Sequence, residues 1–262
     1  MTISLLGCGW LGLPLAEAMI GEGFEVRGST TTAEKLQILR DAGIEPYALS
    51  LGTSGLNGDA KNFLAKADML IIDIPPKLKQ GNFTDKIKML IPHIEKSGIR
   101  KVLFVSSVSV YGNNQGIVTE DTKPLPDTEN GKQLLEVEQL LLANDHFNTT
   151  ILRFGGLIGG ERHPVYQLAG KENLPGSAAP VNLIHRDDCI SIIQAIVQKD
   201  IWGEVFNAVA PHHPSREEYY TRKAIELRLP LPLFVTQNAS LGKTVSSLKI
   251  KQGAGYIFRG HI

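Results

Sequence analysis

The chain has 262 residues, with 27 basic and 27 acidic side chains, so its formal net charge at pH 7 is zero. No basic stripe interrupts this balance, and we therefore expect neither nucleic acid nor an acidic membrane surface as a partner. Hydrophobic residues make up 42% of the chain, which is enough for a sizeable core. The two cysteines, Cys8 and Cys189, lack metal-type spacing, and a reduced cytoplasm suits them as small core residues.

The segment before Cys8 is short and holds no Lys or Arg, so it does not fit a lipoprotein signal. No later stretch offers the roughly 20 consecutive apolar residues that a membrane-spanning helix needs. We therefore expect a soluble, cytoplasmic protein.

Strand and helix patterns alternate along most of the chain. Short apolar runs predict seven strands, at residues 2–6, 24–28, 47–51, 69–74, 101–106, 149–154 and 205–208. Among the expected helices are one from about residue 13, one from a capping box at residues 31–34 to near residue 43, one over 127–143 and one over 187–198. Apolar strands separated by helices predict an α/β fold with a doubly wound parallel (Rossmann) sheet.

The pattern changes after residue 209. Pro and His cluster at residues 211–214, and Ser215 with Glu218 predicts the cap of one further helix. Residues 155–183 are also irregular and rich in Gly and Pro. These features predict two units: a dinucleotide-binding domain of residues 1–153 and 185–209, and a small C-terminal substrate lobe of residues 154–184 and 210–262. The lobe would cover the carboxyl ends of the strands, where ligands bind in such folds.

The strongest motif is Gly7-Cys8-Gly9-Trp10-Leu11-Gly12, which follows the first strand and opens the first helix. Gly7 would allow the tight turn, Gly9 the approach of a pyrophosphate, and Gly12 the close packing of helix on strand. The pyrophosphate would rest on the helix N-terminus. We therefore expect these six residues to bind NAD(P), with Cys8 as a buried spacer. The alternative is that the glycines only turn the chain.

The end of the second strand bears on the choice between NAD and NADP. NAD enzymes typically carry Asp or Glu there, which holds the ribose 2′-hydroxyl. This chain has Arg27, Ser29, Thr30 and Thr31, and no acid before residue 34. These side chains, which Lys35 could join, favour NADP over NAD, although Arg27 could instead point to solvent. Strand ends elsewhere complete the expected cofactor site, with Ile74, Pro75, Pro76, Ser106 and Phe154.

Four later segments resemble landmarks of the extended short-chain dehydrogenase/reductases, in the same order. They are Ser106 to Gly112 (S-S-x-x-V-Y-G), Arg153 to Gly159, Ile184 to Asp188 (I-H-x-x-D), and Phe206-Asn207. Residues 9–12, 159–164 and 210–214 are more similar to the atypical YeeZ-like subgroup, whose members are usually described as NAD(P)-binding relatives of epimerases and dehydratases.

The resemblance implies a Rossmann fold and an NAD(P) cofactor. It also implies oxidoreductase or epimerase chemistry on a sugar, a nucleotide-sugar or another carbonyl or alcohol compound. A homodimer through the helices that flank the sheet is a further expectation from family likeness.

One departure limits what the resemblance implies about the reaction. The family's Tyr-x-x-x-Lys pair, which supplies its proton donor, is absent: Asn130 and Leu134 stand at those positions. A register shifted by two residues gives Thr128 and Lys132, which restores a lysine but no phenol. The loss matters because a positioned acid or base typically contributes about a hundred- to ten-thousand-fold to such a reaction.

The remaining catalytic candidates are Ser107, Ser109 and Lys132. Ser107 matches the family's active-site serine, which hydrogen-bonds the reacting oxygen. It could instead cap the end of its strand, and Lys132 could be a solvated charge on its helix rather than a ribose contact.

The candidate substrate ligands are Tyr111, Arg162, His163 and Asn182. Tyr111 matches a family landmark that usually packs near the site. Arg162 and His163 lie in a Gly-rich loop beyond a strand end, where they could meet an anionic substrate.

Other polar residues favour structural roles. Asp73 ends an apolar strand, where loop N–H groups would satisfy its carboxylate, although it could contact ribose or substrate. His185 and Asp188 fit a buried, hydrogen-bonded turn, and no metal site is expected from His212 and His213 because no third ligand is evident.

Two functions from different classes follow. The first is an NAD(P)-dependent oxidoreductase or epimerase with a small-molecule substrate. The second is a non-catalytic dinucleotide-binding sensor, which the absence of the Tyr-x-x-x-Lys pair favours.

Overall fold

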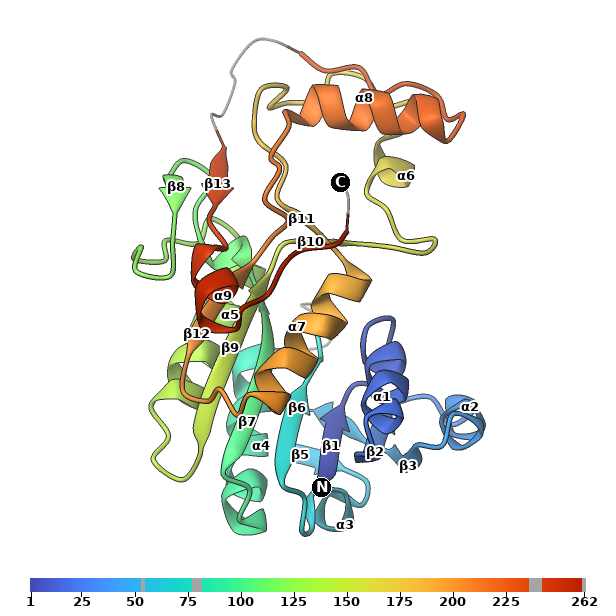
Figure 1. Cartoon of the computed structure of the whole chain (residues 1–262), viewed down its shortest axis with the longest axis vertical. Helices are drawn as coiled ribbons and strands as arrows, with labels where there is room; N and C mark the ends of the chain where they lie inside the picture. Colours follow the sequence, from blue (N-terminus) through green and yellow to red (C-terminus); the bar gives the residue numbers. More distant parts are fainter. Residues whose placement is uncertain (53–54, 77–81, 236–241, 261–262) are drawn as a thin grey trace.

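The computed structural model describes residues 1–52, 55–76, 82–235 and 242–260. Its centre is a seven-stranded parallel sheet in the order β12-β9-β7-β6-β1-β2-β3 (Figure 1). The strands are β1 (Thr2–Leu6), β2 (Glu25–Thr30), β3 (Glu45–Ala48), β6 (Met69–Ile72), β7 (Lys101–Ser107), β9 (Asn148–Phe154) and β12 (Val205–Ala208). The chain winds outward from β1 to one edge and from β6 to the other, which confirms the predicted doubly wound parallel sheet.

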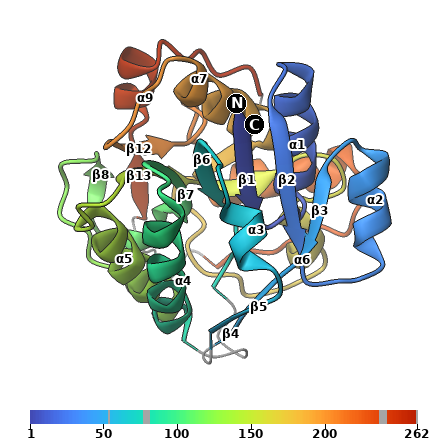
Figure 2. The ribbon, with the colours of Figure 1, turned by 90° about the horizontal axis from the view of Figure 1, so that it is seen from below.

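Helices cover both faces of this sheet (Figure 2). They are α1 (Gly12–Gly21), α2 (Lys35–Asp41), α3 (Ala60–Leu64), α4 (Phe83–Ser97), α5 (Glu129–Leu142), α7 (Arg186–Gln198) and α9 (Leu248–Gly253), whereas α6 (Val165–Leu168) and α8 (Arg216–Glu226) lie away from the sheet. In the described part of the chain, none of them is long and apolar enough to cross a membrane.

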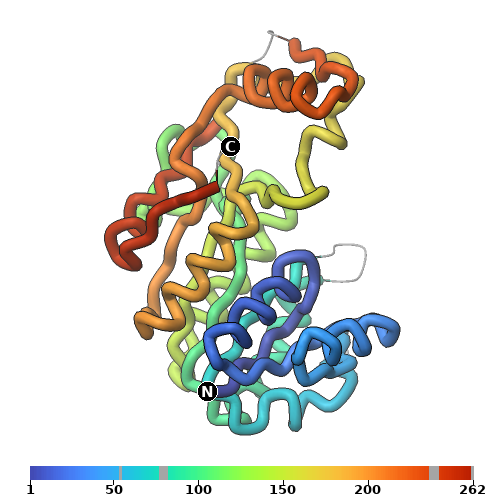
Figure 3. The backbone as a smooth tube through the Cα atoms, turned by 45° about the vertical axis from the view of Figure 1, so that its right-hand side comes forward, coloured from blue at the N-terminus to red at the C-terminus, as the bar shows by residue number. Residues whose placement is uncertain are grey.

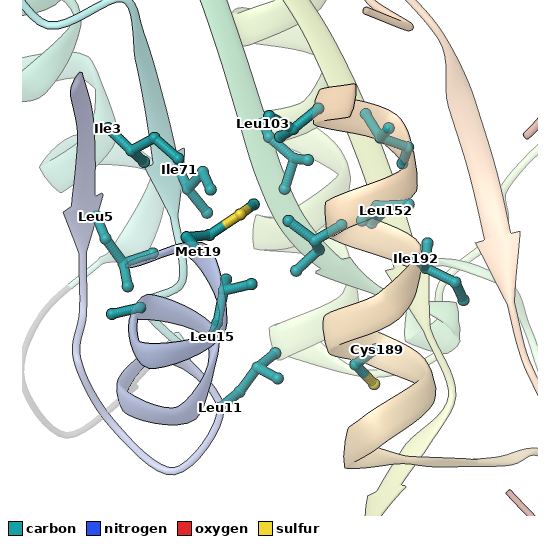
Figure 4. Packing of buried hydrophobic residues seen from close by; sticks show 14 of the residues in the cluster. Ile3, Leu5, Leu11, Leu15, Met19, Ile71, Leu103, Leu152, Cys189 and Ile192 are labelled. Carbon is teal, nitrogen blue, oxygen red and sulfur yellow. The ribbon is translucent and has the colours of Figure 1, made fainter. Parts of the chain in front are cut away.

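Alternation along the strands divides the core into two layers. In β6, Met69 and Ile71 pack in one cluster with α1 and α7, whereas Leu70 and Ile72 pack in a second cluster with α3, α4 and α5. Successive side chains of a strand point to opposite faces, so an uninterrupted apolar run is buried on both sides. Figure 4 shows the first layer, in which α1 and α7 converge on the sheet around Leu15.

Two predicted boundaries are wrong. The strand expected at 47–51 is divided, because β3 ends at Ala48 and β4 (Ser50–Gly52) turns back to pair antiparallel with β5 (Gly55–Asn57). The capping box expected at 31–34 does not form: α2 begins at Lys35 without a side-chain cap, and the Thr32 amide donates to the Thr30 hydroxyl instead. Local side-chain bonding of this kind competes with helix initiation.

A smaller layer lies beyond the carboxyl ends of the central strands (Figure 3). It contains the parallel pair β10 (Gly156–Ile158) and β11 (Leu183–His185), and the parallel pair β8 (Gly116–Val118) and β13 (Lys243–Val245). A third apolar cluster joins β10 and β11 to α6 and α8 around Tyr219 and Tyr220, whereas β8 and β13 pack on the second cluster of the main core. The predicted cap of α8 is confirmed, since the Glu218 amide donates to the Ser215 hydroxyl over 3.2 Å.

The last described residues do not pack in the lobe to which the sequence assigned them. Ile250, Ala254 and Tyr256 belong to the α1–α7 layer of the main core rather than to the α8 cluster. The Tyr256 hydroxyl also donates to the Asp188 carboxylate over 2.6 Å. Residues 248–260 therefore pack on the sheet domain, and the predicted assignment of all of 210–262 to the lobe does not describe them.

Candidate active site

The glycine turn between β1 and α1 has the form that its motif predicts. Gly7 has a φ of +110°, and a Cβ added to it would lie 2.3 Å from the carbonyl oxygen of Asp73. A Cβ on Gly12 would lie 2.1 Å from the carbonyl oxygen of Gly7, so both positions exclude a side chain. Gly9 is exposed, and a Cβ on it would meet no atom within 4 Å. The turn therefore packs tightly on its inner side and leaves open space at Gly9.

Ser29 of β2 holds this turn through two hydrogen bonds. The Gly7 amide donates to Ser29 Oγ over 2.9 Å, and the Cys8 amide donates to the Ser29 carbonyl over 2.8 Å. Cys8 is buried, and burial is the main reason that its thiol pKa rises to about 12. This neutral thiol is a buried spacer, as predicted, while Ser29 holds the turn and is committed there.

Arg27 does not reach the carboxyl end of its strand. Its Nε donates to Glu45 Oε2 over 3.1 Å, and its Nη1 donates to backbone carbonyls in and after α3, at Asn62, Phe63 and Ala65. These bonds turn the guanidinium along the sheet toward the end of α3. The predicted contact of Arg27 with a 2′-phosphate is therefore not supported by its placement, and Thr30 and Thr31 are left at the strand end.

A cleft of about 610 Å³ opens beside the turn, across the carboxyl ends of β1, β6, β7 and β9. Most of the predicted cofactor residues line this cleft, although they lie far apart in the sequence. The lining residues are Gly9, Trp10, Leu11, Asp73, Ile74, Pro75, Pro76, Val105, Ser106, Ser107, Ser109, Asn130, Leu134, Phe154, Gly155, Gly156, Leu157 and Arg162. Of these, Val105 and Gly155 to Leu157 were missed, although they adjoin strand ends that the sequence does predict.

Ser106 and Ser107 end β7 at this cleft in different environments, and Ser109 lines it from the turn that follows. Ser107 Oγ accepts a hydrogen bond from the Ser109 amide over 3.2 Å and so caps a short 3₁₀ helix, Val108–Val110. Its own proton is left to donate into the cleft, because the described residues offer it no acceptor. Ser106 Oγ instead donates to Glu138 over 2.6 Å behind the cleft. Ser107 is therefore a cap, which was one of its two expected roles, and it also lines the cleft.

The same cleft bears on the two registers for the family's Tyr and Lys. Asn130 and Leu134 of α5 line it, whereas Thr128 and Lys132 do not, which favours the first register. Lys132 is exposed and lies outside the lining. Lys132 stands two residues after Asn130 and two before Leu134, which is about 200° around the helix from each, so its placement does not support the predicted catalytic role.

Tyr111 is 1% exposed and cannot contact a substrate, which corrects its place among the predicted ligands. Its hydroxyl donates to the Thr119 carbonyl over 2.9 Å and receives a hydrogen bond from Arg153 Nη1 over 2.6 Å. Arg153 also donates to the buried carboxylate of Glu138, with its Nη2 2.6 Å from Oε2. This buried cluster fixes β7, β9 and α5 behind the serines.

Glu138 was not singled out from the sequence, yet a signal was present. It follows Leu134 by four residues and precedes Leu141 by three, which places a carboxylate on the apolar face of α5. A charged side chain at such a position needs a buried partner, which here is Arg153.

Asp73 and Arg162 are the only titratable side chains in the lining given by the described residues. The Asp73 carboxylate accepts a hydrogen bond from the Gly12 amide, as predicted for a loop-satisfied acid. Burial raises the pKa of Asp73 to about 8, while Arg162 and the Gly12 amide partly oppose that rise. At neutral pH this acid is therefore largely protonated beneath the glycine turn.

Two predicted substrate ligands turn out to be structural. His163 Nδ1 accepts from the Val165 amide over 3.1 Å, so Nε2 carries the proton and donates to Tyr219 Oη over 2.9 Å. Burial lowers the pKa of His163 to about 4, which keeps it neutral. The Asn182 side chain joins β11 to β13, donating to the Lys243 carbonyl over 2.7 Å and accepting from the Val245 amide over 2.9 Å. Neither His163 nor Asn182 lines the cleft, whereas Arg162 does.

Comparison with known proteins gives the family. Protein YeeZ of Escherichia coli K12 is 32% identical to this chain over 262 residues, covering 98% of this chain and 95% of the relative. The chain belongs to the YeeZ family. The YeeZ protein of Escherichia coli O157:H7 matches to the same extent, and no family model matches the sequence.

Solved structures share the fold of this YeeZ family member. A functionally unknown conserved protein from Silicibacter pomeroyi has a TM-score of 0.79 and 22% identity, covering 98% of this chain and 93% of that one. UDP-glucuronic acid 4-epimerase from Bacillus cereus, in complex with NAD, has a TM-score of 0.81 and 20% identity, covering 100% and 92%. The same epimerase was also solved with UDP-glucuronic acid and NAD. The structural neighbours include epimerases and a short-chain dehydrogenase/reductase superfamily protein from Agrobacterium tumefaciens.

Proposed function

We propose that this protein is an NAD(P)-dependent oxidoreductase of the epimerase type that acts on a carbonyl or alcohol group of a sugar or nucleotide-sugar. The observation that carries the proposal is that one continuous cleft contains both the open glycine turn at Gly9 and Ser107. The ligands of the similar Bacillus cereus epimerase, NAD and UDP-glucuronic acid, support a dinucleotide and a nucleotide-sugar here.

The residues of the cleft fit such a cofactor. The open space at Gly9 and the start of α1 would hold its diphosphate, and Ile74 and Phe154 would form apolar walls that exclude water. The bound nicotinamide would accept and return a hydride. Ser107 would donate its proton in a hydrogen bond to the reacting oxygen. Because the pKa of a serine hydroxyl is too high for it to act alone as the acid or base, a substrate group or water would supply the proton on reduction and take it up on oxidation.

The preference for NADP over NAD belongs to the same proposal. With Arg27 bonded elsewhere, the preference is supported by Thr30 and Thr31 and by exposed Lys35 at the start of α2. Titration calorimetry with NADPH and NADH tests it. Equal or tighter binding of NADH would overturn the preference without affecting the fold.

A second candidate function is that of a dinucleotide sensor. The specific observation in its favour is that Asn130 and Leu134 line the cleft at the positions of the family's proton donor and lysine. Neither side chain exchanges protons at neutral pH. A sensor would bind the dinucleotide in the same cleft and turn over no substrate.

The test that separates the two is a screen of aldehydes, keto-sugars and nucleotide-sugars with NADPH and NADH, followed by variants on any hit. We expect Ser107→Ala to lower turnover at least tenfold with nearly unchanged cofactor affinity, since it removes a bond made to the reacting oxygen. The control is Ser97→Ala at the end of α4, where the hydroxyl donates only to the Ile94 carbonyl. Full activity of Ser107→Ala would remove its catalytic role, and a silent screen with tight NADPH binding would favour the sensor.

A further inference from the structure

Two arginines pack against the indole ring of Trp10, which is itself part of the glycine turn. The guanidinium carbon of Arg162 lies 4.9 Å from the ring centroid, and that of Arg186 lies 5.2 Å from it. Cations held against a tryptophan face at such distances are attracted by its ring electrons. Trp10 therefore holds two positive charges beside the amides that begin α1.

The backbone presents both arginines as one unit. Arg162 ends a tight turn that closes on Gly159, with N–O distances of 3.0 and 3.2 Å between the two residues. Gly159 has a φ of +131°, and a Cβ on it would lie 2.9 Å from His185 Nε2 and 3.2 Å from the Cβ of Arg186. The turn thus packs directly on the start of α7. Figures 1 and 3 show this segment, between β10 and α6, passing beyond the ends of α7 and α1.

Neither arginine forms an ion pair within the described part of the chain, although Arg162 lies near enough to Asp73 to oppose the rise of its pKa. No carboxylate there lies within 4.0 Å of either guanidinium. The Nε atom of Arg186 is buried and has no hydrogen-bond partner. A buried donor without a hydrogen-bond partner is unfavourable, and so are two adjacent cations. An anion placed between the two guanidinium groups would accept a hydrogen bond from the donor and offset both charges.

We propose that Arg162 and Arg186, held by Trp10, form a clamp for the diphosphate of the dinucleotide. The clamp rests on the proposed function, because it needs a dinucleotide in the cleft. A guanidinium binds phosphate oxygens through two parallel N–H bonds, so two of them match a diphosphate. The start of α1 would contact the diphosphate from one side, and the clamp would contact it from the turn after β10 and from the start of α7. Arg162 is thereby assigned to the cofactor rather than to an anionic substrate.

The experiment uses Trp10 as its own reporter. The protein has two tryptophans, and Trp202→Phe leaves Trp10 as the single one. In this background, Trp10 fluorescence is titrated with ADP-ribose, NADH and adenosine for Arg162→Met, Arg186→Met and Arg162→Lys. The matched control is Arg222→Met on α8, an arginine that also lies over an aromatic ring, that of Tyr219.

We expect each Met variant to weaken binding of ADP-ribose and NADH at least tenfold and to leave adenosine binding unchanged. The affinity of Arg162→Lys for ADP-ribose and NADH should lie between that of the Met variants and that of the parent. Arg222→Met should bind both ligands as tightly as the parent does. The salt dependence of ADP-ribose binding should also become shallower in the Met variants, because a charge contact is lost.

Wild-type affinity of Arg162→Met and Arg186→Met for ADP-ribose would overturn the clamp and leave the proposed function standing. An equal loss of adenosine and ADP-ribose binding would also overturn it, since the effect would not concern the diphosphate. If the parent protein binds neither ADP-ribose nor NADH, the proposed function fails together with the clamp.

Discussion

Gly9→Val should abolish dinucleotide binding and leave the protein folded. A Cβ at Gly9 meets no atom within 4 Å, and the residue is exposed, so we expect a stability loss of at most about 1 kcal/mol. For a chain of this length, that corresponds to a melting temperature lower by about 2 °C. The valine side chain would stand where the diphosphate must approach the turn. We expect affinity for NADH or NADPH to fall at least hundredfold, which is about 2.7 kcal/mol of binding free energy.

Gly12→Ala is the matched control with the opposite expectation. Its Cβ would lie 2.1 Å from the Gly7 carbonyl oxygen and 3.2 Å from Asp73 Oδ2, so the backbone of the turn must shift. Overpacking of this kind costs about 1–3 kcal/mol, or about 2–6 °C in melting temperature. Thermal unfolding and titration calorimetry on both variants separate stability from binding. Unchanged binding by Gly9→Val would show that the turn is only architecture, and melting as low as that of Gly12→Ala would refute the open space at Gly9.

Three further predictions concern the titratable groups. Glu138→Gln should lower the free energy of unfolding by about 3–5 kcal/mol, because Arg153 stays buried without its countercharge; a urea-unfolding loss below about 1 kcal/mol would contradict this. Because burial raises the pKa of Asp73 to about 8, the carboxylate ionises under the turn between pH 7 and 9 and should then repel a diphosphate. ADP-ribose affinity should fall over that range in the wild type and stay flat in Asp73→Asn, and equal pH profiles would exclude the effect. The pKa of His163 is about 4 in the folded state and ordinarily 6.5, so the unfolded state takes up a proton first and stability should decrease as pH falls from 6.5 to 4. His163→Gln should flatten the melting temperature over this window, and a wild-type slope in the variant would assign the loss to other groups.

The sequence by itself determined the sheet and the cofactor turn. Uninterrupted apolar runs separated by helices specify buried parallel strands through local periodicity alone, and the strand at 205–208 was predicted to the residue. The positive φ of Gly7 and the close approach of Gly12 to the Gly7 carbonyl also follow locally, because both lie within one turn. The replacement of the Tyr-x-x-x-Lys pair was visible as well, but the choice between its two registers was not.

Only the tertiary structure decided which polar side chains face the cleft. Arg27 bonds to carbonyls 35 to 38 residues away, and His163 bonds to a hydroxyl 56 residues away. Asn182 is bonded to a carbonyl 61 residues further along the chain. In the sequence each resembles a ligand because it is polar and lies in or after a strand. A buried polar group takes whichever partner the packed elements bring to it, and that partner is fixed by long-range contacts rather than by local pattern.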